Sequence, residues 1–128
     1  MTPNAAVRKG LQKIGVKASG ESVDGDESVD GIELLNQMLH SWELVGVDLK
    51  HYDATSGNEI PLPQNHDIAI IYNFAVFAAP EYEVSASPEV VGIAISSMQA
   101  LRNAYLDPNA KLEVDKTLLP YYNANYRL

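Results

Sequence analysis

Apolar residues recur at intervals of three and four along much of the chain, and this spacing predicts helices. The first predicted helix covers residues 3–14, has proline at its first position, and ends before Gly15. The second begins near residues 26–28 and continues to Val45, where Gly46 ends it. Its apolar stripe is the strongest periodic signal in the sequence and consists of Ile32, Leu35, Met38, Leu39, Trp42 and Val45.

Two further helices are predicted in the second half of the chain. An apolar run over roughly residues 66–79 lies between Pro63 and Pro80, and its length and alanine content favour a central helix over a buried strand. Ser87, which precedes a proline, begins a fourth helix that continues to about Tyr105. The stripe expected on the fourth helix consists of Val91, Ile95 or alternatively Ala94, Met98, Leu101 and Tyr105. The predicted fold is therefore all-α, a four-helix bundle.

Two segments lack a helical period. Residues 47–63 combine apolar positions with two prolines and a Thr-Ser-Gly-Asn turn, which predicts a projecting loop or an irregular β-hairpin. The carboxyl-terminal residues are too apolar for a solvated end, so we expect an extended tail that lies in a groove of the same subunit or of a partner. This pattern divides the chain into a helical domain, residues 1–107, and a docking tail, residues 108–128.

The net charge of −8 arises from nine Lys and Arg against 17 Asp and Glu residues. A DNA-binding surface needs clustered cations, so DNA is not expected as a ligand, although DNA can pass an acidic surface without sticking. The chain contains no cysteine, which excludes disulfides, thiolate zinc sites and cysteine nucleophiles. The longest apolar stretch is too short to span a bilayer, and the amino end lacks the apolar core of a secretion signal, so no membrane partner is expected.

Motifs of catalysis and metal binding are weak or missing in the sequence. The acidic segment from Asp24 invites a calcium-loop interpretation, but Val29 stands where the loop needs glycine and Leu35 where it needs glutamate. The three histidines, at positions 40, 51 and 66, share no metal-pair spacing on a helix. No serine-hydrolase elbow or phosphate-binding glycine loop is present, so neither a cofactor, a metal site nor an enzymatic activity is expected.

The aromatic residues are of two kinds. Trp42 lies on the apolar stripe of the second predicted helix and is expected in the core. The tail tyrosines lie outside any periodic pattern, and tyrosine is enriched at protein interfaces. The residues expected to dock on a partner are Leu118, Leu119, Tyr121, Tyr122 and Tyr126, and those expected in a contact loop are His51, Tyr52, Asn58 and Ile60.

One order of motifs resembles a known family. A basic first helix ends in Leu-x-x-Ile-Gly-Val at residues 11–16, an acidic loop follows, and residues 35–42 read Leu-Asn-Gln-Met-Leu-His-Ser-Trp before Gly46. Residues 79–82, Ala-Pro-Glu-Tyr, are similar to the family's turn between the third and fourth helices. The pattern resembles the head-to-tail adaptor proteins of tailed, in particular short-tailed, bacteriophages, also described as tail accessory or packaged-DNA-stabilisation proteins. It spans about residues 5–107, and its most specific residues are Leu35, Met38, Leu39, Trp42 and Gly46.

The resemblance implies a structural virion protein of the head–tail junction that is made in the host cytoplasm. Such subunits form a ring, commonly of twelve copies, beneath the portal protein, and the ring extends the DNA channel and gives the tail nozzle a platform. They help to retain the packaged DNA, which passes through the channel without specific binding. The family's carboxyl-terminal segment reaches the portal, which implies that role for the present tail.

A closed ring needs two different complementary faces on each subunit. The basic first helix and the acids that open the second helix are expected to provide them, namely Arg8, Lys9, Lys13, Asp26 and Asp30. Two alternatives remain open at this stage. One is a generic helical protein–protein interaction module, and the other is a hydrolase of cell-wall glycan, which would need a pair of carboxylates that the sequence does not single out.

Overall fold

The computed structural model describes residues 1–49, 53, 55 and 58–106, and this part of the chain is entirely helical, with no strand. It contains four α-helices: α1 (Pro3–Lys13), α2 (Gly25–Ser41), α3 (Asp67–Ala78) and α4 (Pro88–Ala104). Three short 3-10 helices are η1 (Trp42–Val45), η2 (Gln64–His66) and η3 (Ala79–Tyr82). The all-α prediction is confirmed. None of the described helices combines the length and the apolar character that a membrane span requires.

Two of the four α-helices, α1 and α4, begin at a side-chain cap that satisfies the backbone. Thr2 Oγ1 accepts a hydrogen bond from Ala5 N at 3.1 Å, and Ser87 Oγ accepts one from Val90 N at 3.3 Å. The second helical segment ends before Gly46 as predicted, and Gly46 has a φ of 95°, but its α-helical part ends at Ser41 and the last four residues form the 3-10 helix η1. The Ser41 hydroxyl donates to Met38 O at 2.6 Å, a local bond that competes with the regular helix ladder.

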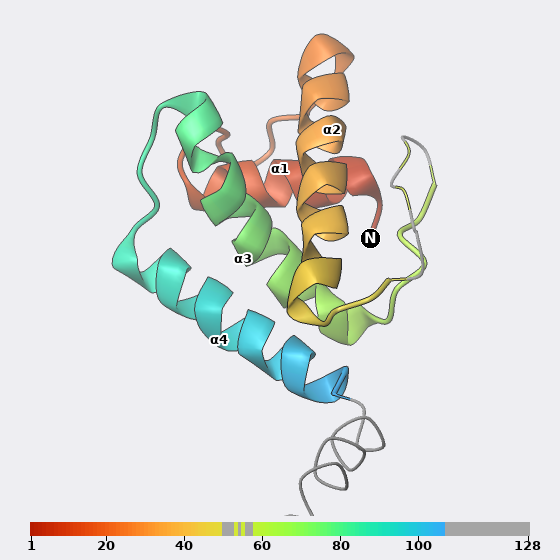
Figure 1. The fold of residues 1–128 in the computed structure, drawn as a ribbon. Helices are drawn as coiled ribbons and strands as arrows, with labels where there is room; N and C mark the ends of the chain where they lie inside the picture. The colour runs from red at the N-terminus through yellow and green to blue at the C-terminus, as the bar shows by residue number, and fades with distance from the viewer. Residues whose placement is uncertain (50–52, 54, 56–57, 107–128) are drawn as a thin grey trace, which may run out of the picture.

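Helix α3 lies at the centre and packs against α1, α2 and α4 (Figure 1). This position explains its composition, since a helix that is covered on several sides must be apolar around most of its circumference. Phe74 and Ile70 are fully buried there. The other large, fully buried side chains among the described residues come from the helices and loop around α3 and are Pro3, Val7, Leu11, Leu35, Met38 and Val47.

Two glycines allow the helices to approach closely. A Cβ atom at Gly10 would lie 2.6 Å from Phe74 Cδ1 on α3, and one at Gly31 would lie 2.5 Å from Val7 Cγ1. Both distances are shorter than any van der Waals contact, so α1 rests on α3 and α2 only because these positions carry no side chain. Neither glycine stands out in the sequence pattern.

The buried face of α4 differs from the predicted stripe. Val90, Ala94 and Leu101 are buried, whereas Ile95 is 62% exposed. Of the two alternatives at this turn, Ala94 is therefore the residue that faces α3. The contact is fixed by Asn73 of α3, whose Nδ2 donates to Ala94 O at 3.0 Å, so the small alanine brings the two backbones together.

The ends of the 47–63 segment belong to the core. Val47 is fully buried, and Ile60 is 6% exposed while its N–H donates to Met1 O at 2.9 Å. The prediction that Ile60 contacts a partner from a projecting loop is therefore corrected: its side chain fills the core beside the amino end. A hairpin is not formed by the residues of this segment that the structure describes.

Candidate functional site

The described residues do not assemble a metal-binding centre. In residues 1–49, 53, 55 and 58–106, no group of three or more His, Asp or Glu side chains is placed to hold a metal ion. The surface features that remain are a groove, an acidic hollow and a pair of oppositely charged helices.

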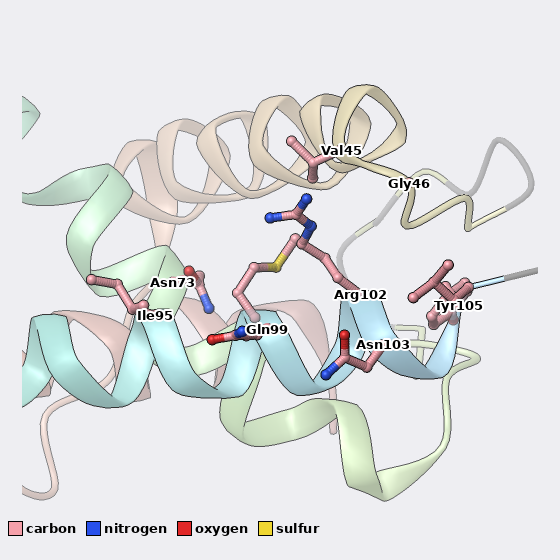
Figure 2. A pocket seen from close by; sticks show the side chains of 10 residues that line it. Val45, Gly46, Asn73, Ile95, Gln99, Arg102, Asn103 and Tyr105 are labelled. Carbon is pink, nitrogen blue, oxygen red and sulfur yellow. The ribbon is translucent and has the colours of Figure 1, made fainter. Parts of the chain in front are cut away.

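The larger hollow is an open groove of about 810 Å³ between η1 and the second half of α4 (Figure 2). Its apolar lining comes from Val45 on one side and from Ile95, Met98 and Leu106 on the other. Figure 2 shows the Arg102 side chain reaching from α4 toward Val45. The groove lies beside the contact between α4 and α3, since Asn73 of α3 lines it together with residues of α4 and the end of η1.

The polar lining of the groove consists of hydrogen-bond donors without a local partner. Gln99, Arg102 and Asn103 make no side-chain hydrogen bond or ion pair to any residue that the structure describes. Asn73 is different, because its Nδ2 already donates to Ala69 O at 2.8 Å and to Ala94 O at 3.0 Å. The groove therefore offers apolar contact together with amide and guanidinium donors, a combination that suits a peptide segment.

A buried histidine supports one end of this groove. His66 is 7% exposed, its Nε2 lies 2.8 Å from the Tyr105 hydroxyl, and its Nδ1 lies 2.7 Å from Asn65 Oδ1. The His66 and Tyr105 rings meet edge to face at 5.7 Å between centroids. This contact connects the start of α3 to the end of α4. No local sequence pattern connects residues 66 and 105.

Burial lowers the pKa of His66 below its ordinary value of 6.5. Asp67 and the Pro63 carbonyl act in the opposite direction, but the loss of solvent around the imidazole outweighs them. We therefore expect the neutral imidazole, with Nδ1–H donating to Asn65 and Nε2 accepting from the Tyr105 hydroxyl.

The shifted pKa predicts a pH-dependent stability. As the pH falls below about 6.5, the unfolded state binds a proton that folded His66 resists, so the free energy of unfolding should decrease until the lower folded-state pKa is passed. Urea denaturation at a series of pH values from 7.5 to 5 should show a steeper loss for the wild type than for His66→Gln, which cannot be protonated. Parallel curves for the two proteins would contradict this role of His66.

A smaller, acidic hollow of about 320 Å³ lies between α2 and η3. Its acids are Asp30, Glu33 and Glu81, and Tyr82 forms part of its wall. Burial raises the pKa of Tyr82, and the nearby carboxylates of Glu27 and Asp30 raise it further. The tyrosine is therefore neutral at physiological pH, and the hollow is a negatively charged feature of the α2 surface.

The residues predicted for inter-subunit charge lie at the surface of α1 and α2. Lys9, Lys13, Asp26 and Asp30 are exposed, and none of them forms an ion pair with another described residue. Arg8 is half-buried and is likewise without an ion pair among the described residues. Lys13 Nζ lies 5.2 Å from the centre of the Tyr72 ring, a cation–π contact that leaves its charge at the surface.

Lys17 differs from Lys9 and Lys13 because it forms ion pairs within the subunit. Its Nζ lies 2.7 Å from Glu27 Oε1 and 3.8 Å from Glu21 Oε2, so it joins the loop after α1 to the start of α2. The hydrogen bond to Glu27 raises the pKa of Lys17. One basic residue of this region is therefore used within the subunit, whereas Lys9 and Lys13 keep their charges available.

The remaining predicted residues divide between the core and the part outside the described residues. The motif residues Leu35, Met38, Leu39 and Trp42 are buried, and Gly46 ends η1 in the left-handed conformation. Asn58 is exposed and its Nδ2 donates to Thr55 Oγ1 at 3.0 Å. The predicted contact and docking residues that lie outside the described residues are His51, Tyr52, Leu118, Leu119, Tyr121, Tyr122 and Tyr126.

Comparison with known proteins adds no relative: no protein-family model matches the chain, and no curated protein matches it significantly.

Proposed function

We propose that the chain is a structural subunit of a head-to-tail adaptor ring in a tailed bacteriophage, docked beneath the portal and presenting a platform to the tail. The observation that carries the proposal is the Leu-Asn-Gln-Met-Leu-His-Ser-Trp segment of residues 35–42, followed by Gly46. In this proposal the four helices are a bundle-like scaffold, the 47–63 segment faces a neighbour or the tail, and residues 108–128 reach the portal. Its place in the virion would be the head–tail junction.

The distribution of charge supports a ring. Exposed cations on α1 and exposed acids on α2 have no ion-pair partner among the described residues, and a heterologous ring brings two such different faces into contact. The net charge of −8 also suits a channel wall, because acidic side chains repel DNA and allow it to slide.

Charge reversal on α1 tests the ring contact. The variant Lys9→Glu/Lys13→Glu should assemble on the portal at least about tenfold more weakly than wild type at low salt, because like charges would then face each other. The matched control adds Asp26→Lys and Asp30→Lys, which restores opposite charges across the interface and should recover assembly. Sedimentation of the ring–portal complex measures the assembly of both variants. Unchanged assembly of the first variant, or no recovery in the second, would count against the proposed pairing.

A second candidate function, a helical protein–protein interaction module outside a virion, is favoured by one observation. Leu44 is 88% exposed next to the groove, and exposed apolar clusters mark interaction sites in many kinds of protein. The two functions differ in assembly. An interaction module would stay monomeric or dimeric when it is mixed with a portal, whereas an adaptor would form a ring.

A further inference from the structure

The groove between η1 and α4 leaves apolar side chains in contact with solvent. Ile95 is 62% exposed, Leu106 is 56% exposed, and Leu44, next to the lining residue Val45, is 88% exposed. Removing such surface from water is favourable by about 25 cal/mol per Å². The part of the chain that the structure describes does not cover the groove, so another segment or molecule can gain by occupying it.

The chain itself continues from the edge of this groove. Leu106 is both a lining residue and the last residue that the structure describes, and residues 107–128 follow it. A segment tethered at the edge of a site has an effective concentration there of the order of millimolar. Weak apolar contacts are therefore enough to keep such a segment bound, although the same contacts would not hold a free peptide.

The sequence of residues 107–128 has a linker followed by an apolar run. Residues 107–117 are rich in charge and include Asp107, Lys111, Glu113, Asp115 and Lys116. Residues 118–122 read Leu-Leu-Pro-Tyr-Tyr and carry no charge. Proline restricts its own φ and keeps the preceding residue out of the helical region, so this run is predisposed to an extended conformation.

The lengths agree. From Ile95 to Tyr105, the part of α4 that lines the groove rises about 15 Å at 1.5 Å per residue. Five extended residues span about 16 Å. The linker of residues 107–117 can reach about 36 Å when extended, which is enough to return residues 118–122 to either end of the groove.

We propose that residues 118–122 of each chain occupy the groove of their own subunit. The leucine and tyrosine side chains pack against Ile95 and Met98, and the backbone carbonyls of the segment accept hydrogen bonds from Arg102 and the neighbouring amides. The inference concerns the isolated subunit and does not depend on the proposed ring. If the chain is an adaptor, the docking segment must leave this groove before it reaches a portal, so the free subunit keeps its docking segment covered.

Limited proteolysis of the full chain tests the proposal. Chymotrypsin cleaves after tyrosine and leucine, and a docked segment must open before the protease binds it. Ile95→Asp should increase the rate of cleavage within residues 118–122 about tenfold, a factor that corresponds to about 1.4 kcal/mol. The matched control is Ile68→Asp, because Ile68 is 58% exposed on α3 but does not line the groove. This variant should be cleaved at the wild-type rate, and circular dichroism should show that both variants are folded.

Three outcomes would overturn the proposal. Equal cleavage rates in wild type, Ile95→Asp and Ile68→Asp would show that Ile95 does not hold the segment. Cleavage of the wild-type chain as fast as that of a free peptide of residues 107–128 would show that the segment is not protected. Protection that disappears on dilution would place the segment of another copy in the groove. All three are measured without a portal, so they leave the adaptor proposal to be tested separately.

Discussion

Replacing Phe74 by alanine is expected to lower the free energy of unfolding by about 3–5 kcal/mol, which is the usual cost of removing a fully buried phenylalanine. Phe74 is fully buried in α3, the helix that packs against α1, α2 and α4. Its loss removes apolar contact and leaves a cavity where these helices meet. The free energy of unfolding of a domain is about 5–15 kcal/mol in total, so the variant should be close to unfolding. Urea denaturation followed by circular dichroism measures the change.

Phe77 provides the matched control on the same helix. It is 39% exposed, so Phe77→Ala should cost about 1 kcal/mol, and the slope of unfolding against urea should be similar in both variants. These two are the chain's only phenylalanines, so the comparison holds the residue type constant and varies burial alone. Equal losses for the two variants would contradict the central position of Phe74.

The second large effect is expected at Gly10. In an exposed helix, glycine to alanine stabilises by about 1 kcal/mol, but the Cβ atom at position 10 would lie 2.6 Å from Phe74 Cδ1 and 3.2 Å from the Ile71 carbonyl oxygen. The backbone atom cannot yield without moving α3, so Gly10→Ala should destabilise the protein by about 2 kcal/mol. Thermal and urea unfolding measure this loss.

Gly92→Ala provides the control, because its expected effect on stability has the opposite sign. It lies within α4, and a Cβ atom there would meet no atom within 4 Å, so Gly92→Ala should stabilise by about 0.5–1 kcal/mol. A double-mutant cycle makes the test sharper. Gly10→Ala should cost less when Phe74 is already alanine, because the closest atom is gone. A stabilising Gly10→Ala, or additive effects in the cycle, would contradict the close approach of α1 and α3.

The sequence predicts the helices well where the apolar pattern is unambiguous. Leu35, Met38, Leu39 and Trp42 follow steps of three and four, and only one face of a helix contains them all, so their burial could be anticipated. The all-α fold class follows from the same periodicity in four separate segments.

The apolar pattern leaves two choices open in α4, because apolar residues stand side by side. Val90 precedes Val91 and Ala94 precedes Ile95, so two neighbouring stripes fit the same helix. The choice between them depends on α3, where Asn73 bonds to Ala94 O and leaves Ile95 toward the groove. A tertiary contact of this kind has no counterpart in local sequence.

The candidate site was the least predictable part of the molecule. The groove combines η1 with residues of α3 and α4 that are far away in the sequence, and its support by His66 and Tyr105 joins residues 39 positions apart. The importance of Gly10 and Gly31 was also missed, because a glycine in a helix shows only that a side chain is absent, and the partner helix decides whether that matters. The charged faces of α1 and α2 were predictable from helical spacing.

Electron microscopy of the purified chain mixed with a phage portal protein encoded beside it tests the proposed adaptor role most directly. We expect end-on views of a closed ring and side views in which that ring extends the portal channel along its axis. Bare portals beside a chain that stays monomeric or dimeric would contradict it.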